Sequence, residues 1–460
     1  MATKTETKAD EIELGAYPTE APAPGPSVPA TPGSTSTASL DTATATGREV
    51  PSLPPVDGGR AAWSFLIAAT VIETVVFGIP FSIGVLHNYW ATHMFPGHEG
   101  TLTLAATLQT GLIYMSIAVL GPVLTAFPHL GRPSQIVGLI VSTAAFISSA
   151  FVTSAPQLIG TMGVLFPFAS ALYLPCATLL FEWFQKRRGM AGGILYSGTG
   201  VGGTVMPFIM DALLTRLGYK ATMIAVGVAY GAINAAALVF IRRRIPLPSR
   251  AEAVGPARRR IDWAVARTWA FWSGVLVLFL SSLGNFNPTL WMPTFADTVG
   301  AKKPGGVALV SIMNAASVPG LLMTGWLSDR LPTKLIVFLN CLVGALAAAL
   351  PWGMGTSTAP LIVFSVVWGL TALSFSSLWT PIITRICQDD PALPTLVFGT
   401  FCFLRGIGNF TSGPISTQLL KSSSFKGAVG AYGSTNFGPV LVYTAATVFA
   451  AAVAGAFFPA

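Results

Sequence analysis

The stretch AAWSFLIAATVIETVVFGIPFSIGVL, residues 61–86, carries a single ionisable side chain, Glu73, among apolar and small residues. A helix needs about 20 predominantly apolar residues to cross the hydrocarbon core of a bilayer. The stretch therefore predicts a membrane-spanning helix. Because an ionisable side chain inside a bilayer is costly, Glu73 is also a candidate functional residue.

Apolar runs of this length recur along nearly the whole chain. Hydrophobic residues make up 52% of the 460 residues and charged residues only 10%, whereas a soluble domain carries about 25% charged residues. Lipid is therefore the expected solvent, and we predict an all-α membrane protein with 12 spans. The remaining expected spans are residues 102–127, 135–152, 158–181, 190–213, 222–241, 269–295, 307–327, 335–352, 361–386, 396–420 and 437–458.

Charged residues between the runs predict the orientation of the chain. Most of the 26 Lys and Arg residues fall in connections on the side of the N-terminus, including residues 186–188, 242–244 and 258–260. The positive-inside rule then places both termini in the cytosol of a multi-pass protein. The plasma membrane is the expected location, with the vacuolar membrane as an alternative.

Two segments outside the spans complete the expected domain plan. The longest connection, residues 242–267, is a basic cytosolic loop that separates six spans in residues 57–241 from six in residues 268–460. Two six-helix halves are typical of duplicated carriers. Residues 1–56 are rich in Pro, Ala, Thr and Ser, and we expect them to form a disordered cytosolic tail.

Three motifs flank spans on the cytosolic side. They are DGGRAAW at residues 57–63, WFQKRRGMAGG at residues 183–193 and GWLSDR at residues 325–330. The last resembles the loop signature of the major facilitator superfamily, and the first two resemble the signatures of the monocarboxylate transporter family, in particular its fungal members. The resemblance covers about residues 57–460 and implies two six-helix halves that alternate the access of a central site.

The resemblance also implies which motif residues serve conformational coupling rather than substrate contact. These residues are Asp57, Gly58, Gly59, Lys186, Arg187, Arg188, Gly325, Asp329 and Arg330. The chain departs from the family pattern at three other places. Pro128 stands where an acid would fall, Phe81 follows Pro80 where the family has a lysine, and Leu321 stands where many fungal relatives have an arginine.

Polar residues within the spans are the candidate substrate site. Arg405 could hold a carboxylate through its planar fork of donors. Glu73 could carry a coupled proton, and the sequence leaves open whether these two residues pair. Asn285, Asn287 and Asn409 are further candidates for substrate binding. For each of the five, the alternative is a structural role in helix packing.

These observations favour a secondary transporter that moves a small organic acid or metabolite and is not an enzyme. The alternative is an efflux pump for a neutral or apolar fungal secondary metabolite. A membrane enzyme is less favoured, because the sequence has no HExxH motif and no intramembrane pair of acids. A nutrient sensor is less favoured, because the tail and the basic loop offer little structured cytosolic output. We expect a monomer with a small-molecule substrate and lipid as partners, and no nucleic acid, cofactor or metal.

Overall fold

The computed structural model describes residues 53–246, 263–301, 303–388, 390, 393–422 and 424–459. All regular elements within these ranges are helices. The predicted disordered tail lies outside the described residues except for residues 53–56, and so does most of the predicted basic loop, residues 247–262.

The first half of the described chain, up to residue 246, contains the helices that frame one side of the bundle. They are α1 (Gly59–Phe81), α2 (Ile83–Tyr89), α3 (Glu99–Ala126), α4 (Gly131–Ser149), α5 (Ala155–Leu158), α6 (Ala169–Trp183) and α7 (Arg188–Leu238). Short 3₁₀ or π segments extend or join them at Trp90–Met94, Pro128–Leu130, Ile159–Leu165 and Phe166–Phe168.

The second half begins after the undescribed part of the loop. Its helices are α8 (Trp269–Asn285), α9 (Asn287–Thr298), α10 (Gly306–Ser328), α11 (Thr333–Ala347), α12 (Thr358–Leu370), α13 (Trp379–Cys387), α14 (Leu393–Leu420), α15 (Ala431–Ser434) and α16 (Gly438–Ala456). Its 3₁₀ or π segments are Trp263–Arg267, Ala348–Trp352 and Leu373–Leu378.

Helix α7 contains two membrane spans. Its 51 residues would extend about 75 Å if straight, far beyond the roughly 30 Å hydrocarbon core. Gly218, with φ of 73°, breaks the helix. The chain then returns to the end where α7 began: Arg132, at the start of α4, donates a hydrogen bond to the Leu238 carbonyl at the end of α7. The described residues hold 11 helices long and apolar enough to cross a membrane, and the double span in α7 confirms the 12 predicted spans.

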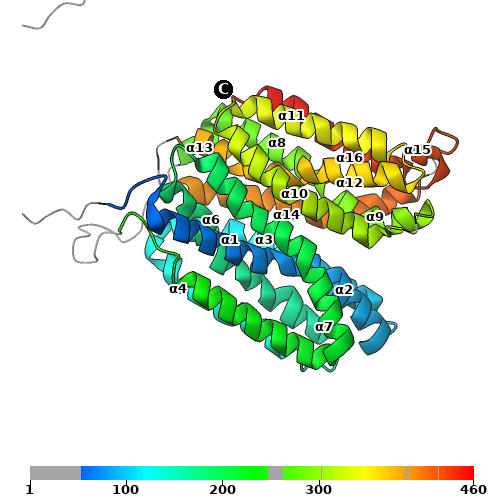
Figure 1. Ribbon diagram of the computed structural model, residues 1–460, viewed down its shortest axis with the longest axis horizontal. Helices are drawn as coiled ribbons and strands as arrows, with labels where there is room; N and C mark the ends of the chain where they lie inside the picture. Colours follow the sequence, from blue (N-terminus) through cyan, green and yellow to red (C-terminus); the bar gives the residue numbers. More distant parts are fainter. Residues whose placement is uncertain are drawn as a thin grey trace, which may run out of the picture. The chain divides into compact units, whose positions relative to one another are not determined.

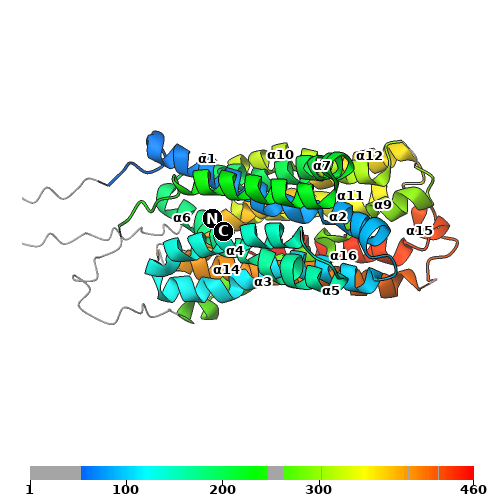
Figure 2. The same cartoon turned by 90° about the horizontal axis from the view of Figure 1, so that it is seen from below.

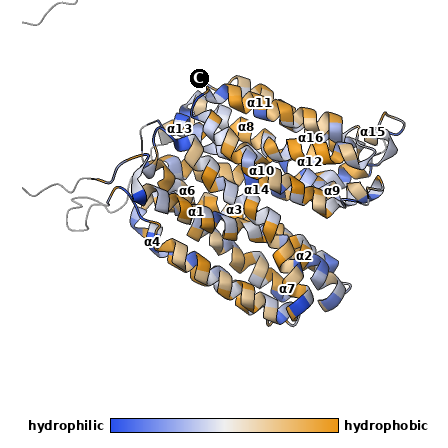
Figure 3. Ribbon diagram, in the orientation of Figure 1, coloured by the Kyte–Doolittle hydropathy of each residue, from blue (hydrophilic) through white to orange (hydrophobic). Residues whose placement is uncertain are grey.

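Hydrophobic residues recur along the length of the helices, and the most hydrophilic residues gather near their ends (Figure 3). Large side chains such as Ile67, Val119 and Phe208 are 61%, 70% and 58% exposed. Exposed apolar side chains in such numbers are expected when lipid is the solvent.

Small residues allow the spans within the first half to pack at close range. A Cβ atom on Gly202 would lie 2.4 Å from the Thr74 carbonyl oxygen, and one on Gly198 would lie 2.6 Å from that of Thr70. Only glycine fits at these two points of contact between α1 and α7.

We call the end of the bundle where α1 begins the motif end, because all three sequence motifs lie there. The spans run between this end and the opposite end, which carries α2 and α15 (Figure 1, Figure 2). The two halves touch through α7 against α10 and through α3 against α14. Their backbones approach closely where Gly193 lies beside Gly325 and where Gly121 lies beside Gly399. In Figure 1 the ribbons of the halves diverge towards the opposite end.

Candidate functional site

A cavity lies between the two halves near the middle of the spans. Its volume is about 70 Å³, counted as space open to the centre of a water molecule. This is room for a few waters, whereas drug-sized ligands occupy pockets of roughly 300–1,000 Å³. The structure therefore shows a contracted site. The cavity is lined mainly by Glu73, Phe77, Phe81, Tyr114, Tyr173, Tyr196, Thr199, Asn314, Ser317, Trp379, Phe398, Cys402 and Arg405.

Glu73 forms part of the wall contributed by the first half. Its side chain projects from α1, is 3% exposed, and accepts a hydrogen bond from the Thr199 hydroxyl of α7. The Tyr173 hydroxyl lies beside it. Its second oxygen, Oε2, is buried without a hydrogen-bond partner among the described residues. A buried oxygen without a hydrogen-bond partner is costly, and a donor group at this atom would remove that cost.

Arg405 lines the same cavity from the second half. Its Nη2 donates to Asn285 Oδ1 at 2.7 Å, and Asn285 Nδ2 donates to the Ala372 carbonyl at 2.5 Å. Asn285 therefore orients the guanidinium towards the cavity. Arg405 and Glu73 line the same cavity but form no ion pair, which answers the question that the sequence left open. In the described part of the chain the guanidinium has no counter-anion, so its remaining donors can bind one.

The other two asparagines differ in position. Asn409 lies one helical turn from Arg405 and lines a small adjoining cavity, and its Oδ1 has no partner among the described residues. Asn287 lines neither cavity. It donates to Thr444 Oγ1 at 3.0 Å and accepts from Ser416 Oγ at 3.1 Å, which ties α9 to α14 and α16. The structure therefore brings Asn285 and Asn409 to Arg405 and leaves Asn287 in the packing of the second half.

Sequence reasoning did not single out the rings of Phe77, Tyr173, Trp379 and Phe398 that wall the cavity. The Phe77 ring lies 4.8 Å from that of Tyr173 and 5.3 Å from that of Tyr114. On the other wall the Trp379 ring lies 5.8 Å from that of Phe398. Such rings offer flat apolar surface to an organic ligand. Their scatter over several spans gave no signal that they would meet.

At the motif end, Asp57 binds the connection between α6 and α7. Its Oδ1 accepts from the backbone N–H groups of Gln185 and Arg187 at 2.9 and 3.0 Å, and its Oδ2 from that of Lys186 at 3.0 Å. Partial burial acts to raise the pKa of this carboxyl, but the three backbone donors outweigh burial and lower the pKa. Gly58 precedes α1, and Gly59 starts it at a φ of 83°, a backbone conformation that favours glycine.

Asp329, at the end of α10, binds the same connection from the second half. It accepts from the N–H groups of Gly189 at 2.6 Å and Met190 at 2.8 Å, which lie in the first turn of α7. Burial raises the pKa of Asp329, and these two hydrogen bonds offset that only in part. Asp329 thus links the two halves, whereas Asp57 acts within the first.

The remaining motif residues surround these two carboxylates. The Arg330 guanidinium lies 3.7 Å from the centre of the Trp326 ring. Arg188 Nε donates to the Phe184 carbonyl, and Lys186 and Arg187 lie at the surface. A Cβ on Gly325 would lie 2.4 Å from the Gly189 carbonyl oxygen. All nine predicted motif residues therefore lie at one end, where the halves meet.

We expect Asp57→Asn to lower the stability of the purified protein by about 1 kcal/mol near neutral pH, because an amide cannot accept all three backbone donors. The ordinary pKa is 3.8 and the folded value lies below it, so this contribution is present above pH 3.8 and is lost as the pH falls below that value. Thermal unfolding of both proteins between pH 7 and pH 3 measures the difference. A stability gap that grows on acidification would contradict the expectation.

Comparison with known proteins identifies the family. The model of the Major Facilitator Superfamily matches residues 64–413. The chain belongs to the major facilitator superfamily. It is a multi-pass membrane transporter, as the sequence predicted, and the superfamily is not an enzyme class.

Its relatives among known proteins are fungal transporters. The MFS transporter asaE of Aspergillus flavus is 25% identical over 84% of this chain and 86% of that protein. The aspyridones efflux protein apdF of Emericella nidulans is 24% identical over 80% of this chain and 74% of that protein. The agnestins efflux protein AgnL12 of Paecilomyces divaricatus is 25% identical over 62% of this chain and 64% of that protein.

Solved structures of the superfamily share the fold. The transporter FucP in its outward conformation aligns with a TM-score of 0.63 at 11% identity, over 87% of this chain and 100% of that one. The human organic anion transporter MFSD10 aligns with a TM-score of 0.61 at 12% identity, over 86% of this chain and 99% of that one. Identities this low show similarity of fold alone.

Proposed function

We propose that this transporter exports an organic anion with a large apolar or aromatic surface, by alternating access of the central cavity. The observation that carries the proposal is the Arg405 guanidinium, which faces an aromatic-walled cavity between the halves without a counter-anion. A carboxylate or enolate would bind the free donors of Arg405, and Asn285 holds the guanidinium in place. The rings of Phe77, Tyr173 and Trp379 would pack on the apolar part of the substrate.

The relatives support the direction and the substrate class. Two of them are efflux proteins for aspyridones and agnestins. Export of a secondary metabolite of fungal type is therefore the function that we infer for this chain. The three motifs support a position near the monocarboxylate transporter family within the superfamily. The binding site differs from that family's pattern, because Phe81 and Leu321 replace its basic residues and the ionisable residues of the site are Glu73 on α1 and Arg405 on α14.

We infer that the motif end faces the cytosol, since the basic residues 186–188 and 242–244 lie there. The proposed location is the plasma membrane and the proposed state is a monomer. Lipid and a small-molecule substrate are its proposed partners, with no nucleic acid.

Counterflow into liposomes that contain the purified protein tests the anion proposal. The panel holds short monocarboxylates, aromatic carboxylic acids and tetramic acids, together with neutral esters of the same aromatic acids. Saturable exchange of the aromatic anions and none of the esters is the expected result. Exchange of the esters at equal rates would contradict anion recognition and favour the second candidate, an efflux pump for neutral apolar metabolites, which the aromatic walls alone would serve.

Glu73→Gln is expected to keep counterflow but to abolish accumulation driven by a pH gradient. Glutamine can still accept from Thr199, so the packing of α1 on α7 is retained, but it cannot take up a proton. Exchange of labelled for unlabelled substrate needs no net proton movement, whereas coupled transport does. The measurement is substrate uptake with and without an imposed pH gradient, together with the internal pH.

Thr199→Val is the matched control, because it removes the hydrogen bond and keeps the carboxyl. We expect this variant to retain at least part of the gradient-driven accumulation. Full accumulation by Glu73→Gln would exclude Glu73 as the proton carrier.

A further inference from the structure

A second cavity lies in the first half at the motif end, away from the substrate site. Its volume is about 410 Å³. It is bordered by the ends of α3, α4 and α6, by the residues after α7, and by Thr395 at the start of α14. Its polar lining includes His129, Arg132, Arg242 and Arg243, and no Asp or Glu of the described chain lines it.

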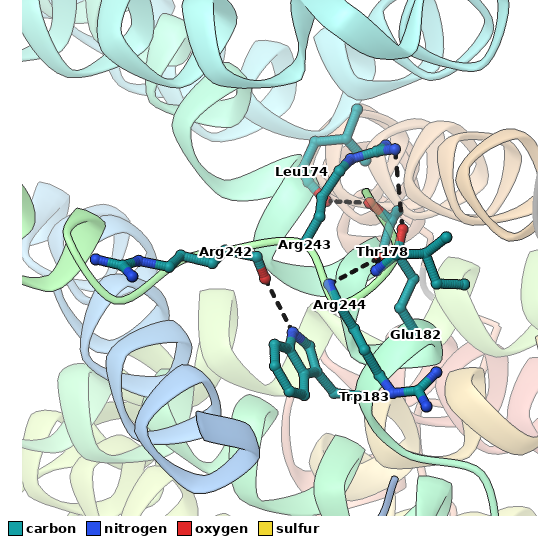
Figure 4. A network of polar contacts seen from close by, with 8 residues as sticks. Leu174, Thr178, Glu182, Trp183, Arg242, Arg243 and Arg244 are labelled. Carbon is teal, nitrogen blue, oxygen red and sulfur yellow. Dashed lines mark hydrogen bonds and ion pairs between the residues drawn. The ribbon is translucent and has the colours of Figure 1, made fainter. Parts of the chain in front are cut away.

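Two of the arginines take part in hydrogen bonds that involve backbone carbonyls beside the cavity. Arg132 Nη1 donates to the carbonyls of Leu238 and Ile241 at 2.7 and 3.2 Å. Trp183 Nε1 donates to the backbone carbonyl of Arg242 at 2.9 Å (Figure 4). This hydrogen bond fixes the position of the Arg242 backbone. Three arginines thus border one cavity, and the hydrogen bonds above fix the positions of two of them.

The charge at this cavity is only partly balanced. Glu182 forms an ion pair with Arg243, with 4.0 Å between Glu182 Oε1 and Arg243 Nη1 (Figure 4). Glu182 Oε2 also accepts a hydrogen bond from the backbone N–H of Arg244. Arg132 and Arg242 have no carboxylate within 4.0 Å among the described residues. An anion bound at the cavity would be attracted to these guanidinium groups, which have no carboxylate partner within the described ranges.

The cavity adjoins apolar surface that faces lipid. Phe127 and Val137, beside the α3–α4 turn, are 40% and 51% exposed, and Phe240, beside the arginines, is 55% exposed. A ligand with both a charged head and apolar chains would match this combination, because the head could reach the arginines while the chains follow the exposed side chains.

We propose that this cavity binds the phosphate-bearing head group of an anionic membrane lipid. Guanidinium groups bind phosphate oxygens through paired, charge-assisted hydrogen bonds. Free phosphate shares the head-group chemistry but lacks the chains. Because Thr395 belongs to the second half, a bound head group contacts both halves where they meet.

Titration of the full-length protein in a neutral detergent tests the proposal. The probes are dioctanoyl phosphatidic acid, dioctanoyl phosphatidylcholine and inorganic phosphate, and binding is read by native mass spectrometry. Phosphatidic acid is expected to bind saturably, at least about tenfold tighter than inorganic phosphate, because the chains add buried apolar area. Saturable binding of phosphatidylcholine with equal affinity, or of phosphate with equal affinity, would overturn the assignment to an anionic lipid.

Variants locate the site. The double variant Arg242→Gln/Arg243→Gln is expected to bind phosphatidic acid about 25-fold more weakly, with about fivefold for each charge near the membrane surface. The control, Arg60→Gln/Lys334→Gln, removes two exposed charges at the same end that do not line the cavity, and it is expected to change affinity by less than about fivefold in total. Equal losses in both double variants would overturn the site.

A single variant keeps the test informative if the double variant does not fold. Arg242 Nε donates only within its own turn, to the Val239 carbonyl at 3.3 Å. Arg242→Gln is therefore expected to fold and to weaken binding about fivefold. An unchanged affinity in this variant would contradict the proposal.

Discussion

Replacing Arg405 with alanine is expected to lower saturable exchange of an aromatic organic anion by roughly 100-fold, equal to about 2.7 kcal/mol. The guanidinium is the one basic group that lines the central cavity, and it has no counter-anion in the described chain. A substrate carboxylate would lose its charge-assisted hydrogen bonds in a setting shielded from water, where such bonds are strongest. Counterflow in proteoliposomes measures the loss.

Two further variants separate recognition from folding. Arg405→Lys keeps the charge but loses the planar fork that binds Asn285, so an intermediate loss of roughly tenfold is expected. Arg216→Ala removes an exposed arginine that lines neither cavity, and wild-type exchange is expected. If Arg405→Ala exchanged the anion at the wild-type rate, the residue would have a structural role only.

The number of spans could be predicted from the sequence because the bilayer imposes a length. Runs near 20 apolar residues are needed in lipid, and the predicted run 190–213 followed by 222–241 correctly divided the continuous helix α7. The turn at Gly218 falls between the two runs. The predicted ends of the spans differ from the observed ones. The first span was predicted at residues 61–86, whereas the helical path runs from Gly59 to Met94.

The candidate site could be predicted only where a residue is costly in lipid. Glu73 and Arg405 stood out because ionisable side chains rarely occur in spans, and both line one cavity. Their roles stay predictions. Asn285 and Asn287 were indistinguishable in the sequence, although one orients Arg405 and the other ties three helices together. Residues two apart on a helical path point to different sides, and hydropathy does not reveal which side faces the cavity.

At the motif end, too, the sequence predicted which residues matter but not which groups they bind. The motifs predicted that Asp57 and Asp329 would serve conformational coupling, but not what they bind. Both carboxylates accept backbone N–H groups of one connection, residues 185–190, rather than pairing with the arginines beside them. Backbone partners carry no sequence signal, so only the fold could reveal this arrangement.

Gly325→Ala is expected to reduce transport more than tenfold by preventing closure of the motif end. The new Cβ would lie 2.4 Å from the Gly189 carbonyl oxygen and 3.0 Å from the Cα of Gly193, both in the backbone of α7. Neither atom can turn aside as a side chain would, so α10 must move away from α7. Because this contact joins the halves, its loss favours the conformation in which they separate at the motif end.

A cysteine at position 380 reports the change directly. Thr380 is 1% exposed and contacts Gly192 across the two halves, so a hydrophilic maleimide should label Thr380→Cys slowly in the protein that carries no other change. Adding Gly325→Ala is expected to raise the labelling rate several-fold. The four native cysteines are buried, and the parent without Thr380→Cys gives their background.

Gly413→Ala is the matched control, because it makes the same substitution inside α14 at a glycine with no heavy atom within 4 Å of the added Cβ. Alanine favours a helix over glycine by about 1 kcal/mol, so this variant should transport normally and be at least as stable. The same helix preference acts at position 325, and any loss there must therefore come from the contact between α7 and α10. Normal transport by Gly325→Ala with unchanged labelling would show that the halves do not need this contact to close.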